Sequence, residues 1–311
     1  MTALHWRKHG VIWQPDGTRA WARTHATCPT PHWRRDGTLR LYVQCRDARG
    51  VGRVGWFDVD PADPRRVQRH AAAPVLDIGE PGCFDDNGVF PTCVTHLADG
   101  RLAMYYVGFE LCHHVRYRLL TGVAVSDDDG DSFRRLSAAP ILERSDGERH
   151  IRGGPFVLFE GDRYRMWYVA GSRWETVNGK SMPIYDVRHI ESHDGLHWPS
   201  QGQVVVPLDL AREHGIGRPF VLRRDEGFRM HYSIRRRSPL RYELGLAHSA
   251  DGLIWRRDDD HIDLQASPGA WDGDSIAYAA EVPIAGRSWI FYNGNDFGGT
   301  GVGLAEQAEG P

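Results

Sequence analysis

Long apolar runs and a signal-like leader are absent from this sequence. Its 311 residues contain no stretch of about 18 apolar side chains, the length that a membrane-spanning helix needs. The opening residues, Met-Thr-Ala-Leu-His-Trp-Arg-Lys, lack the apolar core of a secretory signal peptide. We therefore expect a cytoplasmic protein with no membrane partner, and small intracellular ligands rather than extracellular polymers.

Cysteine and unbalanced charge are also scarce. The five cysteines form no CxxC motif and are odd in number, which favours reduced thiols over the alternative of a disulfide framework. The 38 basic and 41 acidic side chains leave a formal net charge of −3, too small for a field that attracts nucleic acid or a membrane surface. We expect no nucleic-acid partner and no cofactor.

The chain does contain an aromatic segment that recurs at a steady interval. Successive copies begin 63, 62, 64 and 60 residues apart. The copies are Leu41-Tyr42, Met104-Tyr105-Tyr106, Met166-Trp167-Tyr168, Met230-His231-Tyr232 and Ile290-Phe291-Tyr292. A fixed period of this length indicates repetition of one supersecondary unit. Each copy is apolar and rich in β-forming residues, as expected of a strand buried on both faces.

Each repeat has the same order of parts. A proline-containing strand comes first, then a polar turn, the aromatic strand, a strand of small apolar residues, a Ser-x-Asp-Gly turn and a fourth strand that starts with an aromatic residue. Asp and Gly suit such a turn, because Asp bonds its own backbone and Gly adopts positive φ. Five units of four strands predict an all-β fold, a five-bladed β-propeller that occupies residues 1–311 as a single domain.

The two ends of the chain complement each other. The last unit stops after its third strand, and Leu4-His5-Trp6 matches Leu196-His197-Trp198 at the start of a fourth strand. We therefore expect residues 4–13 to form the outermost strand of the last blade. This strand would close the ring and cover strand edges that otherwise invite aggregation.

The motifs resemble those of a known superfamily. The Ser-x-Asp-Gly-x-x-Trp turns, Gly154-Pro155-Phe156-Val157 ahead of the Met166 strand, and the fivefold repeat are similar to those of the five-bladed propeller glycosidases. These are the arabinanase, β-xylosidase, invertase and levansucrase type, together with the mannoside phosphorylases. The resemblance covers about the whole chain and implies a carbohydrate-active enzyme, a glycosidase-like hydrolase acting on a small sugar or sugar-like substrate in the central channel.

Candidate site residues lie at the entrances of the innermost strands, where five distant segments of a propeller converge. The candidates for chemistry are Asp86, Glu213, Asp274, His150 and His214. The candidates for substrate binding are His25, Asp85, Asn87, Arg152, Arg218, Tyr278 and Glu281. The histidines show no HxH or HxxxH spacing, so we expect no metal site.

The carboxylates that the resemblance implies are incomplete. The resembling enzymes place an Asp in blade one, an Asp in blade two and a Glu before the Gly-Pro of blade three. Here blade one has no carboxylate between Arg23 and Arg35, and Gly153 occupies the position of the Glu. A hydrolase would have to pair Asp86 with Glu148 or with one of the acidic candidates above. Otherwise His150, His214 and Tyr278 are the acid–base candidates, for an elimination, isomerisation or transfer.

Basic residues stand where those carboxylates are missing. Arg152 and Arg218 occupy nearly the same register in neighbouring blades, and two guanidinium groups in one pocket would bind a carboxylate or phosphate. The alternative is that each pairs with an acidic residue of a neighbouring blade, such as Asp86 or Asp274. The sequence thus leaves open an enzyme on an anionic sugar-like substrate, a non-hydrolytic biosynthetic enzyme, and a binding propeller without a reaction.

Three long connections between second and third strands, 107–121, 170–188 and 234–243, are placed to cover such a pocket. One of them carries Arg235-Arg236-Arg237, for which a solvated charge run is the simpler interpretation. The tyrosines of the repeated segment are assigned to the core.

Overall fold

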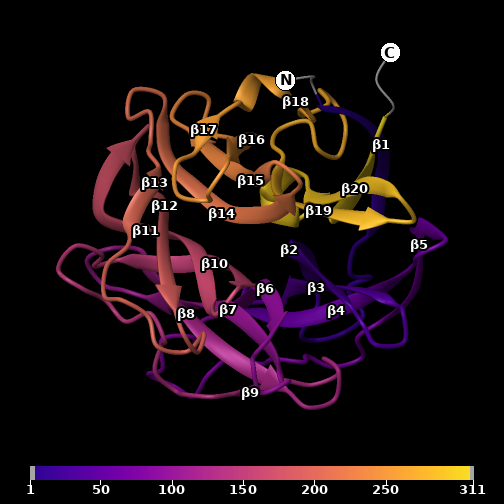
Figure 1. The fold of residues 1–311 in the computed structure, drawn as a ribbon, viewed down its shortest axis with the longest axis horizontal. Helices are drawn as coiled ribbons and strands as arrows, with labels where there is room; N and C mark the ends of the chain where they lie inside the picture. The colour runs from indigo at the N-terminus through magenta and orange to yellow at the C-terminus, as the bar shows by residue number, and fades with distance from the viewer. Residues whose placement is uncertain (1–3, 309–311) are drawn as a thin grey trace.

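The computed structural model describes residues 4–308, and within them the chain is almost entirely β-strand (Figure 1). The helical segments of this part are the 3₁₀ turn η1 (Asp259–His261) and the four-residue α1 (Asn295–Gly298). Neither is long or apolar enough to cross a bilayer.

The strands fall into five antiparallel groups in chain order. The first group contains β2 (Thr24–Trp33), β3 (Leu39–Arg46), β4 (Gly52–Asp60) and β5 (Asp63–His70). The second contains β6 (Val89–His96), β7 (Leu102–Leu111), β8 (Tyr117–Ser126) and β9 (Arg134–Arg135). The third contains β10 (Ile151–Glu160), β11 (Arg163–Val177), β12 (Lys180–Ser192) and β13 (Gln203–Val206).

The remaining groups come from the last third of the chain and from its beginning. The fourth contains β14 (Glu213–Arg224), β15 (Gly227–Arg236), β16 (Tyr242–Ser249) and β17 (Arg256–Arg257). The fifth contains β19 (Ala277–Ile284), β20 (Arg287–Asn293), β21 (Val302–Gln307) and β1 (Leu4–Trp13), with β18 (Ile262–Asp263) beyond β1. Short parallel pairings of β8 with β10 and of β12 with β14 join the three middle groups into one sheet.

The first strands of the five groups, β2, β6, β10, β14 and β19, lie nearest the centre in Figure 1. Each contacts the first strand of the next group, and β19 contacts β2. The aromatic repeat forms the second strands. Its tyrosines, assigned to the core from the sequence, are at most 1% exposed in every group.

A repeated irregularity shapes the innermost strands. At equivalent positions the pairing register shifts, and the residue at the shift adopts positive φ. These residues are Cys28, Gly154, Arg218 and Tyr278. Only glycine adopts this conformation freely, so the other three hold local strain. Such a bulge turns side chains away from the regular alternation, here toward the centre.

The Ser-x-Asp-Gly turns have a structural role. In one of them the Ser192 hydroxyl accepts from the Gly195 amide at 3.0 Å, and Trp198 donates its indole N–H to the Gly195 carbonyl. The aromatic residue thus closes the turn rather than starting a long strand. Trp255 makes the same bond to the Gly252 carbonyl at 2.9 Å, ahead of the two-residue strand β17.

The N-terminal strand joins the last group, as expected from the sequence, but it is not the outermost strand there, because the two-residue β18 pairs with its other edge. β1 pairs antiparallel with β21, from Trp6 opposite Gln307 to Trp13 opposite Val302. Trp6 is 8% exposed and packs into a cluster that also contains Ile290 and Ala305. The first strand therefore contributes apolar burial as well as backbone pairing to the last group.

Truncation tests how much the fold depends on this strand. Deletion of residues 1–13 is expected to lower the melting temperature strongly or to abolish soluble expression, because it exposes the edge of β21. Trp6→Ala should cost about 3 kcal/mol, as expected for removal of a buried aromatic side chain. Val11, which is 38% exposed, supplies the control. Its alanine variant should unfold within about 0.5 kcal/mol of wild type in urea. Unchanged melting of the truncated chain would contradict this role of β1.

Candidate functional site

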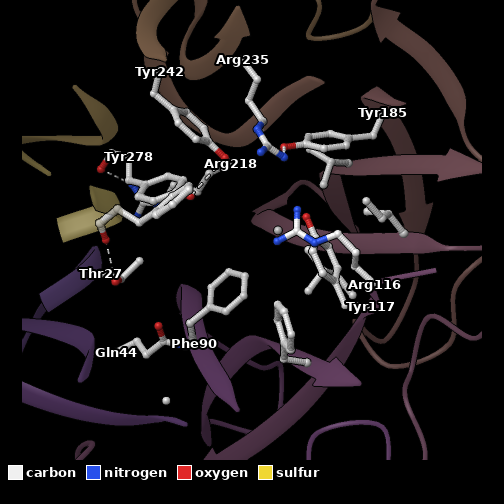
Figure 2. Close-up of a pocket in the computed structure, with 18 of the residues that line it drawn as sticks. Thr27, Gln44, Phe90, Arg116, Tyr117, Tyr185, Arg218, Arg235, Tyr242 and Tyr278 are labelled. Carbon is white, nitrogen blue, oxygen red and sulfur yellow. Dashed lines mark hydrogen bonds between the residues drawn. The ribbon is translucent and has the colours of Figure 1, made fainter. Parts of the chain in front are cut away.

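A cavity of about 480 Å³ opens at the centre of the fold, and all five groups of strands contribute to its wall (Figure 2). The long connections between second and third strands supply several polar side chains of the wall. Arg116 and Tyr117 lie at the β7–β8 hairpin, Lys180, Met182 and Tyr185 in the β11–β12 hairpin, and Arg235 and Tyr242 on either side of the β15–β16 turn. The connections expected to cover a pocket therefore supply much of its lining. Its volume suits one small ligand.

The charge of the cavity wall is unbalanced. Five cationic residues line it, and the one carboxylate in its lining is Asp296. The cationic residues are Arg46, Arg116, Lys180, Arg218 and Arg235. None of them has an ion pair with a carboxylate of residues 4–308. Elsewhere most arginines of this region have such partners, for example Arg40 with Asp58 at 2.8 Å. The excess of positive charge in the wall favours binding of an anionic ligand.

Arg235 is the most enclosed of these cations without a backbone acceptor. It is 9% exposed, and its Nη1 donates to the Tyr185 hydroxyl at 3.3 Å. Its guanidinium also lies 5.2 Å from the centre of the Tyr242 ring. Burial lowers the pKa of Arg235, but Tyr185, Tyr242 and Tyr117 around it more than offset this, so its pKa lies well above the ordinary value. The group is a permanent positive charge with no anionic partner within residues 4–308.

Arg116 approaches the same point from another group of strands. Its Nη1 lies 3.8 Å from the Met182 sulfur, and Arg235 Nη2 lies 3.8 Å from that sulfur too. Arg116 is an exposed residue, and its Nη1 also donates to the Ser181 carbonyl at 3.4 Å. A thioether is a weak acceptor, so both guanidinium groups retain unused capacity to donate. Because both groups contact the same sulfur, they lie on the same side of the cavity wall. With Lys180 in the same lining, these residues form what we call the anion clamp: Arg116, Lys180 and Arg235.

A different part of the wall contains Arg46 and its neighbours. Arg46 Nε donates to Gln44 at 3.3 Å, and its Nη1 lies 3.1 Å from His25 Nε2. The same His25 nitrogen is 3.4 Å from Asp296. Burial and the Arg46 charge lower the pKa of His25, although Asp296 partly opposes this. His25 is therefore neutral near pH 7 and holds Arg46 in position rather than competing for an anion.

Aromatic side chains cover much of the remaining wall. They are Phe90, Phe109, Tyr117, Tyr185, Tyr242, Tyr278 and Phe297. Burial raises the pKa of Tyr185, Tyr242 and Tyr278 above the ordinary tyrosine value. These phenols remain protonated at neutral pH, so they donate hydrogen bonds and do not act as bases. Their ring faces suit the apolar faces of a sugar or another ring.

Arg218 lines the cavity, but its hydrogen bonds are structural. Its Nη1 donates to the Tyr278 carbonyl at 3.0 Å and to the Ala279 carbonyl at 2.9 Å. Its Nη2 donates to the Pro29 carbonyl. The side chain therefore connects β19 to β2 across the centre of the fold. Carbonyl oxygens take up most of its donors, which leaves little for a ligand.

Arg152 does not reach the cavity, so the expected pairing of Arg152 with Arg218 is not present. Its Nε donates to Glu148 at 2.5 Å, and its other nitrogens donate to the carbonyls of Glu143 and Pro199. Arg152 is 2% exposed, so it forms a buried, structural ion pair with Glu148. The carboxylate partner comes from its own group of strands and not from a neighbouring one.

The acidic candidates are engaged elsewhere or lie outside the cavity lining. Asp85 accepts from Tyr106 at 3.0 Å and from Arg135 at 2.8 Å, and Glu148 accepts from Tyr168 at 2.8 Å. Glu213 and Glu281 are at most 1% exposed and pair with two arginines each. Asp86 accepts from the Gly82 amide and from Asn87, and Asp274 is exposed. The cavity wall receives none of these six carboxylates.

The other candidates divide between the cavity and its surroundings. Asn87 and Tyr278 line the cavity, and His25 stands behind Arg46. His150 and His214 do not line it. Burial lowers the pKa of His214 to about 4, with Arg235 and Arg237 adding to the effect. His214 is thus a neutral buried group near pH 7. Within residues 4–308 no cluster of three metal-ligating side chains is found.

Sequence reasoning missed most of the cavity cations. Arg46 follows the first aromatic strand without a motif, and Arg116 stands in a polar hairpin. Arg235 was assigned to a solvated charge run. In the structure its neighbours Arg236 and Arg237 do not match that interpretation either, since Arg236 pairs with the buried Glu213 and Arg237 pairs with the partly exposed Glu175. The sequence did contain one indication of the role of the cavity cations. Arg116 and Arg235 stand in long connections between second and third strands, and these connections converge on the cavity.

The fold is that of known propeller-like carbohydrate-active proteins. A structure described as a glycoside hydrolase shares it with a TM-score of 0.73 and 20% identity, over 100% of this chain and 93% of the other. A structure from a study of the GH130 family of mannoside phosphorylases gives 0.69 and 14%, over 98% and 94%. The endo-arabinase from Bacteroides thetaiotaomicron VPI-5482 gives 0.67 and 14%, over 96% and 97%. At these identities the likeness establishes the all-β, propeller-like fold alone.

Sequence similarity places the chain within a particular family. No family model matches it. Uncharacterized protein Rv1502 of Mycobacterium tuberculosis (strain ATCC 25618 / H37Rv) is 33% identical over 302 residues, covering 97% of this chain and 99% of the relative. Uncharacterized protein MT1551 of strain CDC 1551 / Oshkosh gives the same identity and coverage. The chain therefore belongs to the family of these mycobacterial proteins.

The two classes of buried arginine predict opposite effects on stability. Arg152→Met should destabilise the protein by about 3–5 kcal/mol, because it leaves Glu148 buried with one fewer partner. Arg235→Met should leave the unfolding free energy within about 1 kcal/mol of wild type or raise it, because it removes a buried charge that has no counter-ion among the residues that the structure describes. Urea unfolding of both variants measures the difference. Equal destabilisation would show that Arg235 is structural too.

Proposed function

We propose that this protein is a carbohydrate-active propeller that binds a small sugar-like ligand carrying a phosphate or carboxylate group in the central cavity. The observation that carries the proposal is the anion clamp. Three cations from three groups of strands line one cavity without a carboxylate partner among the described residues. Cations with this arrangement serve planar or tetrahedral oxyanions, which guanidinium groups bind through paired hydrogen bonds.

The aromatic wall supports a ring-shaped ligand. Phe90, Phe109 and Tyr117 line the same cavity as the clamp, and the ring centroids of Phe109 and Tyr117 lie 4.8 Å apart. Protonated phenols of Tyr185 and Tyr278 supply donors for hydroxyl or anionic oxygens. A sugar ring has apolar faces and polar edges, so it suits such a wall. The propeller-like neighbours, among them proteins described as glycoside hydrolases and mannoside phosphorylases, agree with this ligand class.

The lining favours chemistry other than two-carboxylate glycoside hydrolysis. That reaction needs an acid and a second carboxylate on either side of the bond. Here the lining contains Asp296 and no second acidic residue of the described chain. A cationic wall instead stabilises negative charge that develops on a substrate, as in eliminations, isomerisations and group transfers. We therefore favour the non-hydrolytic alternative over hydrolysis.

We also propose the finer architecture that the site requires. The five groups of strands are the blades of a five-bladed β-propeller, a single domain over residues 1–311, and β1 closes the ring. The contacts of β19 with β2 and the pairing of β1 with β21 support this interpretation. The five free cysteines agree with a cytoplasmic protein.

Binding of simple sugar phosphates tests the proposed ligand class. Glucose 6-phosphate should bind wild type more tightly than glucose in isothermal titration, and rising salt should weaken its binding. Arg235→Met should weaken glucose 6-phosphate about tenfold to a hundredfold, as expected for a lost hydrogen bond to a charged group. Arg65→Met is the matched control, because Arg65 is exposed and pairs locally with Asp63 at 2.6 Å. Equal affinity for glucose and its phosphate, or no binding of a panel of sugar phosphates and uronates, would contradict the proposal.

A panel of nitrophenyl glycosides, uronides included, tests the preference for non-hydrolytic chemistry. We expect no turnover above background, because no carboxylate pair lines the cavity. Asp86→Asn serves as the comparison. Asp86 is the residue of the second group that the hydrolase alternative uses, in the blade where the resembling glycosidases have an Asp. Turnover by wild type that disappears in this variant would restore the hydrolase interpretation.

A further inference from the structure

The cavity carries more positive charge than one anionic group balances. Five cations face one carboxylate in its lining, and Asp296 lies beside His25 rather than in the clamp. A phosphate bound by Arg116, Lys180 and Arg235 would still leave Arg46 with Asp296 as its acidic neighbour in the described chain, and that carboxylate is 70% exposed and contacts His25 rather than Arg46. Burial lowers the pKa of Arg46, which shows that its charge is costly there. A buried or half-buried cation of this kind needs a partner.

Arg46 and the clamp lie in different parts of the wall. Arg46 ends β3 in the first group and is bonded to Gln44, whereas the clamp residues come from the second, third and fourth groups. Figure 2 shows Gln44 at the lower left, with Arg116, Tyr185 and Arg235 toward the centre and upper right. Phe90 lies between these two sides in this view. The cavity therefore has two separate cationic positions with an aromatic wall between them.

The neighbours of Arg46 orient it for a ligand without neutralising it. Gln44 fixes Nε, and its own amide is anchored on the Val89 carbonyl at 3.0 Å. His25 takes one Nη1 hydrogen through Nε2, while its Nδ1 lies 2.8 Å from the Thr24 hydroxyl. His25 adopts positive φ, a conformation that is strained for a residue other than glycine. The guanidinium is thus held in a fixed direction, and neutral groups hold it there.

We propose that the ligand carries two anionic groups at opposite ends of a sugar-like body, one bound by the anion clamp and the other by Arg46. This inference rests on the proposed function and specifies its substrate class. Sugar bisphosphates and phosphorylated sugar acids have this chemistry. Such a ligand neutralises both cationic positions, and its ring lies against the aromatic wall between them.

Paired ligands that differ by one anionic group test the inference. Glucose 6-phosphate is compared with glucose 1,6-bisphosphate and with 6-phosphogluconate by isothermal titration at fixed ionic strength. Wild type should bind at least one of the doubly anionic ligands about tenfold or more tightly than glucose 6-phosphate, in line with one added charged hydrogen bond. Arg46→Gln should remove this preference and leave glucose 6-phosphate binding within about threefold. Arg235→Met should weaken all three ligands, and Arg65→Met should weaken none.

A second variant tests the same site with a gain in affinity. Asp296 is exposed and has positive φ, which asparagine tolerates well, so Asp296→Asn should fold normally. Removing its negative charge beside Arg46 should tighten the doubly anionic ligand severalfold and leave glucose 6-phosphate unchanged. Equal binding of singly and doubly anionic ligands by wild type and by Arg46→Gln would overturn the second anion site and leave the proposed function standing. Failure of all three ligands to bind would overturn both.

Discussion

Buried carboxylates anchored inside the strand groups are the constraint on which the rest of this structure depends. Tyr106 donates to Asp85, Tyr168 to Glu148, and Tyr292 to Asp272, each from the aromatic strand to the residue ahead of an innermost strand. A carboxylate in such a place is costly unless it is bonded on several sides, and these have hydroxyl partners as well as basic ones. Once they serve the fold in this way, the central cavity loses the acidic groups that a propeller hydrolase would use there.

The same constraint explains the cationic cavity. The acidic residues that enter the core are taken up by structural arginines such as Arg152, Arg135 and Arg257. The arginines of the cavity wall have no such partners among the described residues. Arg235 is surrounded by tyrosines, which supply ring faces and oxygen atoms but no negative charge. A buried charge without a counter-ion lowers the stability of the fold. Such charges are found at functional sites, where an anionic ligand supplies the missing partner.

The architecture was accessible from the sequence because it repeats. The aromatic strands are nearly continuous apolar runs spaced about 60 residues apart, and burial on both faces requires that composition wherever the strand lies. The site was not accessible in the same way. Asp85 and Arg152 stand at the expected register, yet a register position does not reveal which neighbour a side chain bonds. Arg235 looked like part of a surface charge run, because its enclosure by Tyr185 and Tyr242 arises only when distant hairpins converge.

Local strain connects the repeat to the site. The innermost strands bulge at equivalent positions, and the residues there adopt positive φ in four of the five groups. Gly154 adopts positive φ without strain, whereas the same backbone conformation is strained at Arg218 and Tyr278. Their side chains explain why the strain persists. Arg218 bonds the carbonyls of Tyr278 and Ala279 and so holds the fourth and fifth groups together at the centre. The bulge of β14 places this arginine, and the equivalent bulge of β19 places Tyr278, whose side chain lines the cavity. One backbone device thus joins neighbouring groups and supplies a surface of the site, so the shape of the cavity follows from the way the ring of strands is held together.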